Sequence, residues 1–282
     1  MACGPSSRSR TSIPKTVVQP LKRPDRPPTV FVCVYRQFIP ADQRLRECVV
    51  EAAAGDAQLA ELNAQLNTGN SIYDWGDDPS FFSAQFLQGS PGRAGWGVCR
   101  PNVRRLVQID DAVVFFCARR ALAADPIDYL FAGYGTVGSR IDDRRIFWAN
   151  PTLLPYRDHF NVLVRPAATG GMEQFERFPP GHEDWEHRAA SPYLIFDPLR
   201  SHFNMTDPVS VAYAERGDMN ETWRETVRAK LIEKILIKDF ALERTLRVAS
   251  TGSSHPHINL TKNLRAAGMT ATQLLALLNP LV

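Results

Sequence analysis

The stretch that most constrains the fold is GWGVCRPNVRRLVQIDDAVVFF, residues Gly95–Phe116. It opens as a flexible aromatic hairpin, continues as a basic run over Cys99–Arg105, and turns at Asp110-Asp111 into an apolar strand, Ala112–Cys117. An indole ring, several guanidinium groups and a rigid strand therefore lie in one short segment. This combination suits recognition of a base and its phosphates, because aromatic rings stack on bases and guanidinium groups bind phosphate bidentately.

Runs of β-favouring residues before and after this stretch predict a mixed sheet of about five or six strands, curled and flanked by helices. Strands are predicted at Thr29–Tyr35, Tyr129–Val137, Asn161–Arg165 and Tyr193–Phe196, with a short strand or turn at Val103–Leu106. Gly133 and Gly135 predict a bulge or a close backbone approach in the second of these strands.

Helical patterns occupy the remainder of the chain. They predict helices within Ala41–Leu66 and Glu221–Leu246 and over Thr270–Leu278, with Thr270 as the N-cap of the last. Loops are expected at Asn67–Arg93, Ala167–Ala190 and Ser250–Asn259. The sum is an α+β fold.

The charge of the chain is concentrated at its start. The 282 residues, 44% of them apolar, are enough to bury a full core, and the net charge is +3. Residues 1–28 hold six Lys/Arg and one acid, which gives that segment +5 and leaves −2 for the rest. Residues 1–28 are therefore expected to be a disordered basic tail, with an organelle transit peptide as the alternative. If the folded part binds nucleic acid, it must do so through a local basic patch, because it has no overall positive charge.

The cysteine pattern and the hydropathy of the chain indicate the cellular compartment in which the protein is expected. The five cysteines, an odd number, form no CxxC pair, which favours a reducing, cytoplasmic interior over a disulfide framework. No apolar run approaches the roughly twenty residues of a membrane span. The first residues, MACGPSSRSRTSIPK, lack the apolar core of a secretory signal. No membrane association is expected.

Two motifs carry a family resemblance. The run Cys99–Arg104, the acidic turn and Val113–Phe116 resemble the pattern C-K/R-P-x-I/V-R…G-D-x-v-x-f of the nucleotide modification associated domains, and Phe131–Val137 resembles their f-x-G-x-G-x-V strand. More distantly, the arrangement is similar to the PUA, ASCH and EVE/YTH barrels. Asp110 departs from the pattern, which has glycine there. The resemblance covers about Thr29–Phe196, and its central part carries the motifs.

The resemblance implies a PUA-like mixed β-barrel, over residues 29–200, with a concave pocket for a nucleobase and an association with DNA-modification enzymes. Residues 201–282 are then expected to be a helical C-terminal extension packed on the barrel. No cofactor is expected: the GxGxxG spacing at Gly133–Gly138 lacks the βαβ context of a dinucleotide site. No metal site is expected either, because His182 and His187 are not spaced i, i+4 as in a helical zinc pair.

Seven residues are candidates for the site. Trp96, with Tyr73 or Trp75, would stack the base; Asn102 would read its edge; Arg100, Arg104 and Arg105 would hold the flanking phosphates. Each residue type also has a structural interpretation. The rings can be core, the arginines can pair with nearby acids such as Asp142-Asp143, and Asn102 can be a turn residue.

The favoured function is recognition of nucleic acid, DNA carrying an unusual or modified base, with the tail adding salt-sensitive affinity. Two rivals remain open. One is an enzyme that acts on a base in the same pocket, with Asp111, which otherwise caps its turn, His159 or the His182–His187 loop as acid–base groups. The other is a non-catalytic partner subunit of a modification or restriction system, which docks another protein through Glu221–Leu246.

Overall fold

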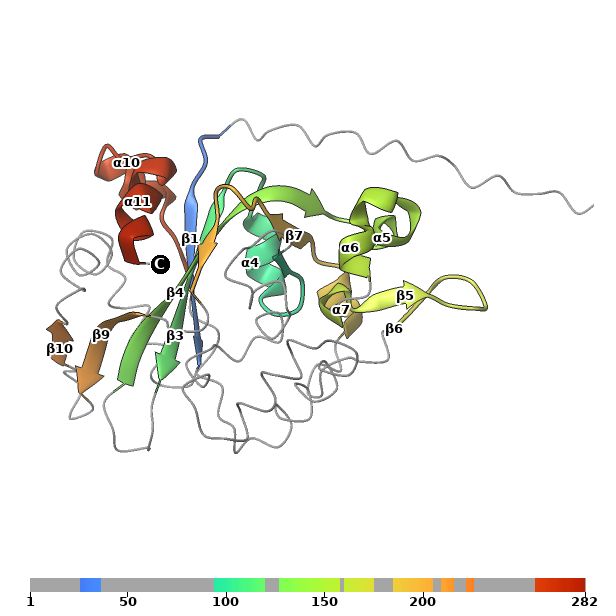
Figure 1. Cartoon of the computed structure of the whole chain (residues 1–282), viewed down its shortest axis with the longest axis horizontal. Coiled ribbons are helices and arrows are strands. Elements are labelled where there is room, and N and C mark those ends of the chain that lie inside the picture. The colour runs from blue at the N-terminus through green and yellow to red at the C-terminus, as the bar shows by residue number, and fades with distance from the viewer. Residues whose placement is uncertain are drawn as a thin grey trace, which may run out of the picture.

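A mixed sheet with short helices on both faces forms the body of the protein (Figure 1). The computed structural model describes residues 26–36, 94–119, 127–157, 160–174, 185–204, 209–215, 222–225 and 257–281. Within these ranges, nine strands make up the large sheet. They are β1 (Val30–Arg36), β2 (Gly95–Trp96), β3 (Ala112–Arg119), β4 (Ile127–Ile141), β7 (Tyr193–Phe196), β8 (His202–Phe203), β9 (Val209–Glu215), β10 (Thr222–Glu225) and β11 (His257–Asn259).

The long strand β4 organises the sheet. The strand order is β10-β9-β4-β3-β1-β11, and only the β1–β3 pairing in this path is parallel. The second half of β4 leaves this path to pair with β7, which in turn pairs with β2. The strand β8 pairs with the middle of β4, at Gly133 and Tyr134. One strand therefore joins three parts of the sheet.

Gly133 allows this branching. It has φ +120°, a conformation that glycine adopts at little cost, and the β3–β4 register shifts next to its partner Phe115. A Cβ at Gly133 would lie 2.2 Å from the carbonyl oxygen of His202. The predicted bulge and close backbone approach are both confirmed at this position.

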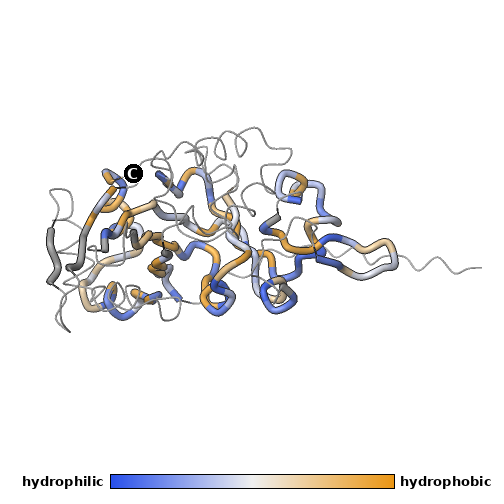
Figure 2. The backbone as a smooth tube through the Cα atoms, turned by 90° about the horizontal axis from the view of Figure 1, so that it is seen from below, coloured by the Kyte–Doolittle hydropathy of each residue, from blue (hydrophilic) through white to orange (hydrophobic). Residues whose placement is uncertain are grey.

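Side chains alternate along β1 and β3 between two cores, as the period of a strand requires. Phe31, Cys33, Val113 and Phe115 face a core that also holds Trp96, while the residues between them face the other core. Figure 2 shows that hydrophobic stretches of the backbone are separated by hydrophilic ones. No helix in the described part of the chain is long and apolar enough to cross a bilayer.

Different helices cover the two faces. One face packs on α4 (Pro101–Leu106), and the other on α10 (Thr261–Ala266) and α11 (Ala271–Leu278), which runs into η6 (Asn279–Leu281). The predicted N-cap of α11 is confirmed, since Thr270 and Gln273 form a reciprocal capping box. The α4 segment is a helix and not the predicted strand or turn, because Pro101 at its first position favours a helical start.

A small lobe extends from the end of β4, opposite α10 and α11 (Figure 1). It contains α5 (Ile146–Ala149), η3 (Pro151–Leu153), α6 (Leu154–Arg157), η4 (Phe160–Val162), the hairpin β5 (Val164–Pro166) and β6 (Met172–Gln174), and α7 (Trp185–Ala189). The strand predicted at Asn161–Arg165 is thus split, because Leu163 has φ +74° between η4 and β5. The expected loop over residues 167–190 includes β6 and α7.

The predicted α+β class is confirmed, and three finer expectations change. The described strands form an open sheet with β10 and β11 at opposite ends, and no closed barrel is found among them. Residues 222–225 form a strand against β9 where a helix was predicted, in keeping with the β preference of Thr and Trp. The expected polar loop before α10 ends in β11, which pairs with β1. Residues 41–93 and 226–256 lie outside the described ranges.

Candidate functional site

Trp96 lies in the core, which corrects the predicted flexible hairpin. Its side chain is fully buried in β2, its Nε1 donates to the Tyr35 hydroxyl at 3.1 Å, and its ring meets Phe115 edge-on at 5.5 Å. The flanking glycines serve close packing: a Cβ at Gly95 or Gly97 would lie within 2.3 Å of an atom of the Tyr193 ring or its hydroxyl. The indole has no exposed face on which a base could stack. The other two predicted stacking rings, Tyr73 and Trp75, lie outside the described residues.

Arg100 and Arg104 are also buried, and both bind backbone carbonyls. Arg100 donates to the Val34 carbonyl, and its guanidinium lies 4.2 Å from the centre of the Tyr35 ring. Arg104 is fully buried and donates to the carbonyls of Cys99, Val98, Arg188, Ser191 and Pro192. These arginines hold the chain around α4 together, and their side chains do not reach the surface where a phosphate would bind.

A third buried arginine, Arg144, binds backbone carbonyls in the same way, and the sequence did not identify it as a site residue or as a core residue. It is buried and shares the Ser191 and Arg188 carbonyls with Arg104, and it also donates to Gly97. Burial, and then the charge of Arg104, lower the pKa of Arg144 well below its usual range. The sequence signal was misleading, because Asp142-Asp143-Arg144-Arg145 is typical of a solvated turn. We call Arg100, Arg104 and Arg144 the buried arginine cluster.

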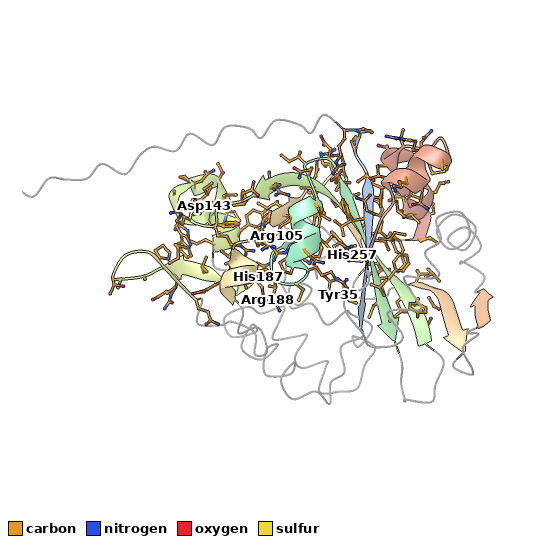
Figure 3. The ribbon with its side chains drawn as sticks, turned by 180° about the vertical axis from the view of Figure 1, so that it is seen from behind. Tyr35, Arg105, Asp143, His187, Arg188 and His257 are labelled. Carbon is orange, nitrogen blue, oxygen red and sulfur yellow. The ribbon has the colours of Figure 1, made fainter. Side chains whose placement is uncertain are left out.

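Of the predicted site residues within the described ranges, Asn102 and Arg105 are exposed. Both lie on α4, and the Arg105 Nη2 is 3.5 Å from His187 Nδ1 of α7 (Figure 3). The structure does not bring them together with Trp96 or the buried arginines in one pocket. The proposed acid–base residues His159 and His182 lie outside the described ranges.

Asp111 has a structural role. Its carboxylate is fully buried and accepts hydrogen bonds from the amides of Thr29 and Gln108, at 2.9 and 2.8 Å. The guanidinium of Arg26 binds both of its oxygens, with Nη1 at 2.8 Å. The predicted turn cap is confirmed. The same carboxylate also fixes the chain where the N-terminal segment joins the sheet.

An open pocket of about 490 Å³ lies on the α11 side of the sheet. Its walls come from five segments that are distant in sequence: the approach to β1, the turn before β3, the middle of β4, the loop from β7 into β8, and α11 with the start of η6. The lining residues are Pro28, Asp110, Tyr134, Thr136, Leu199, Arg200, His202, Ala271, Thr272, Leu275, Ala276 and Asn279. A pocket of this size suits a ligand of nucleoside or nucleotide dimensions.

One wall of the pocket is aromatic and carries hydrogen-bonding groups. The rings of Tyr134 and exposed His202 lie 5.5 Å apart at 56°. The Tyr134 hydroxyl donates to Asn279 Oδ1 at 3.2 Å, and both residues line the pocket. Burial raises the pKa of the Tyr134 hydroxyl above its ordinary value. Leu199, 88% exposed, adds apolar surface at the rim.

The pocket lining also holds an ion pair. The Arg200 guanidinium donates to Asp110 through Nη1 and to Asp197 through Nε, both at 2.7 Å. Burial opposes the Arg200 charge, but these two carboxylates raise its pKa. Asp110 and Arg200 of the pocket lining balance each other's charge, and Asp197, which pairs with Arg200 outside the lining, adds one negative charge beside the pocket. A bound anion would therefore meet little positive charge there.

The sequence pointed to only part of this pocket. Asp110 and the strand containing Tyr134 belong to the motifs quoted above, but Arg200 and His202 were not singled out. Their signal is the polar segment Asp197–His202 directly after the buried strand β7, a position where loops carry function.

Within the described ranges, no cluster of three or more His, Cys, Asp or Glu side chains could hold a metal ion. Comparison with models of protein families, with curated proteins and with solved structures gave no match.

Proposed function

We propose that this protein binds nucleic acid and seats one base in the pocket between β4, the β7–β8 loop and α11. The observation that carries the proposal is the position of Pro28. This residue lines the pocket and ends the segment of residues 1–28, whose net charge is +5. A cationic segment attached at the rim of a neutral-to-acidic base pocket can bind the phosphates while the base enters.

The attachment of that segment is firm. Arg26 is held by the buried Asp111, and the residues that follow it lead directly into β1. The effective concentration of the basic segment at the pocket is therefore high, since only a short link separates them. The pocket alone or the basic segment alone would bind nucleic acid weakly. Together they would bind it more tightly, and the affinity would depend on the salt concentration.

The pocket can contribute stacking and edge recognition. Exposed His202 offers an aromatic face next to the ring of Tyr134, which is 5% exposed, and Thr272 of α11 and Asn279 of η6 offer polar groups. These residues replace Trp96 and the motif arginines in the role that the sequence had assigned to them. The favoured ligand stays DNA carrying an unusual base, in line with the resemblance to the nucleotide modification associated domains. The proposal also includes a structural relationship to PUA-like barrels and an association with modification or restriction proteins.

We also infer a cytoplasmic location. The five cysteines, an odd number, form no CxxC pair, and Cys33, Cys99 and Cys117 are buried in the core, a usage typical of proteins in a reducing interior.

The test is fluorescence anisotropy of the full chain with short labelled oligonucleotides, single- and double-stranded DNA and RNA, at two salt concentrations. His202→Ala should weaken binding about tenfold, the effect expected for loss of one base-stacking contact. The matched control is His187→Ala, which removes an exposed imidazole on the α4–α7 surface and should leave the affinity unchanged. Binding that depends on His187 and not on His202 would move the site to α4, and absence of binding would refute the proposal.

A further inference from the structure

Leu199 exposes an apolar side chain at the rim of the pocket. Among the described residues, three large hydrophobic side chains are exposed: Leu154 at 48%, Leu106 at 54% and Leu199 at 88%. Single exposed leucines are common on protein surfaces, so exposure alone indicates no function. Leu199 is distinguished by its position, because it lines the proposed base pocket together with Arg200 and His202.

The backbone of the turn that carries Leu199 is held by several hydrogen bonds. Pro198, whose ring fixes φ, occupies the second position of the turn, and the Arg200 amide closes it by donating to the Asp197 carbonyl at 3.2 Å. The Leu199 amide donates to Asp197 Oδ1 at 2.9 Å. Thr136 of β4 accepts from the Asp197 amide at 2.8 Å, and its hydroxyl donates to the Arg200 carbonyl at 2.7 Å. The turn is therefore fixed to β4, while the leucine side chain faces solvent.

The Arg200 side chain supports the same turn. Its guanidinium donates through Nε to Asp197 within the turn and through Nη1 to Asp110 in the turn before β3, both at 2.7 Å. The residue after Asp110 is Asp111, which binds Arg26 of the basic segment. Two adjacent acids thus connect the turn at the pocket rim to the point where the basic segment is attached.

We propose that Leu199 is a wedge that enters a DNA duplex at the position of the base that moves into the pocket. This inference rests on the proposed function. A base that leaves a duplex loses its stacking on both neighbours, and an apolar side chain inserted at that step replaces part of the lost contact. The wedge and the pocket must be adjacent, since the extruded base stays attached to its own strand. Leu199 and His202 meet this condition because both line the same pocket.

The experiment measures by anisotropy the affinity of the full chain for a labelled duplex and for one of its single strands. Leu199→Ala should weaken duplex binding about tenfold, because one leucine side chain is no longer buried in the complex. It should leave the affinity for the single strand unchanged, since no base pair has to be opened there. The loss should be smaller on a duplex with one central mismatch, because a mismatched base is extruded at lower cost. The variant should keep the melting temperature of wild type, since Leu199 is exposed.

The matched control is Leu154→Ala, which removes another exposed leucine, in α6 of the lobe opposite α10 and α11 (Figure 1). It should bind both ligands as wild type does. The wedge would be overturned, with nucleic-acid binding intact, if Leu199→Ala bound the duplex as tightly as wild type or lost as much affinity for the single strand. Binding of wild type to the single strand alone would overturn it as well. Failure of wild type to bind either ligand would overturn the proposed function and this inference together.

Discussion

Two regions of the molecule use arginine in opposite ways. Around α4, the buried arginine cluster is enclosed in the protein and donates to backbone carbonyls. Beside α11, Arg200 is half-exposed and pairs with two carboxylates at the wall of a pocket. The first region carries the motif that stands out in the sequence, and the second carries the groups that a ligand can reach.

The difference shows that a conspicuous motif can specify a fold and not a binding site. A guanidinium group has five N–H donors in a fixed plane, so that one arginine can satisfy several carbonyls where the chain forms no regular structure. Arg104 does this for the turn before α4 and the turn before β7. The basic run therefore adds little positive charge to the surface, although its composition suggested a phosphate site.

The strongest test of this contrast is Arg104→Ala. It would leave several buried carbonyls without donors, and each such group costs about 1–3 kcal/mol. The free energy of unfolding, measured with urea, should fall by about 4 kcal/mol, unusually large for a single substitution.

Arg105→Ala, the next residue on the same helix, serves as the control. Because Arg105 is exposed, its loss should change the free energy of unfolding by less than about 0.5 kcal/mol. Equal effects of the two variants would contradict the assignment of Arg104 to the core.

A smaller effect is expected from Gly97→Ala. The new Cβ would lie 2.3 Å from the Tyr193 ring and 2.4 Å from the Asn161 carbonyl oxygen, which forces the packing around β2 to shift. Overpacking of this kind costs about 1–3 kcal/mol. Gly138→Ala is the comparison, since the nearest neighbour of its new Cβ would be 3.2 Å away. In thermal unfolding, the melting temperature of Gly138→Ala should be clearly higher than that of Gly97→Ala. The reverse ranking would mean that β2 is not packed as described.

The smallest expected effect is on the free energy of unfolding when Asp197, the partner of Arg200 beside the pocket, is replaced, and it depends on pH. Burial acts to raise the pKa of Asp197, but hydrogen bonds from Arg200 and from the Leu199 amide lower it below its ordinary value. A lowered pKa gives stability that is present above the unfolded-state pKa and is lost as the pH falls through the folded-state value.

The difference in free energy of unfolding between wild type and Asp197→Asn should therefore be constant above about pH 5, at less than about 1 kcal/mol, and shrink below about pH 4. Urea titrations across this range measure it. A difference that stays constant or grows in acid would show that the ion pair does not form.

Much of the fold could be predicted from local patterns. The β-favouring runs of β1 and β3, the glycines of β4 and the Thr270 cap each depend on a few neighbouring residues, and all were confirmed. The strands at residues 222–225 and 257–259 were missed because each is short and owes its state to pairing with a distant strand. Tertiary pairing overrides local preference in such segments.

The site was harder to predict, for a physical reason. Burial decides whether an arginine or a tryptophan is structural, and burial depends on which distant segments cover it. Arg104 is covered by residues 188–192, and Trp96 packs on Tyr35 and Phe115. The pocket likewise joins Pro28, Asp110, His202 and Asn279, which no sequence spacing connects.

The most direct test of the central claim is amide hydrogen exchange of the full chain with and without a short single-stranded oligonucleotide. If the ligand site is the pocket beside α11, exchange should slow at Leu199–Phe203 and Ala271–Asn279 and stay unchanged at Pro101–Leu106. Slower exchange confined to Pro101–Leu106 and Trp185–Ala189 would contradict the account and return the binding site to the α4 surface.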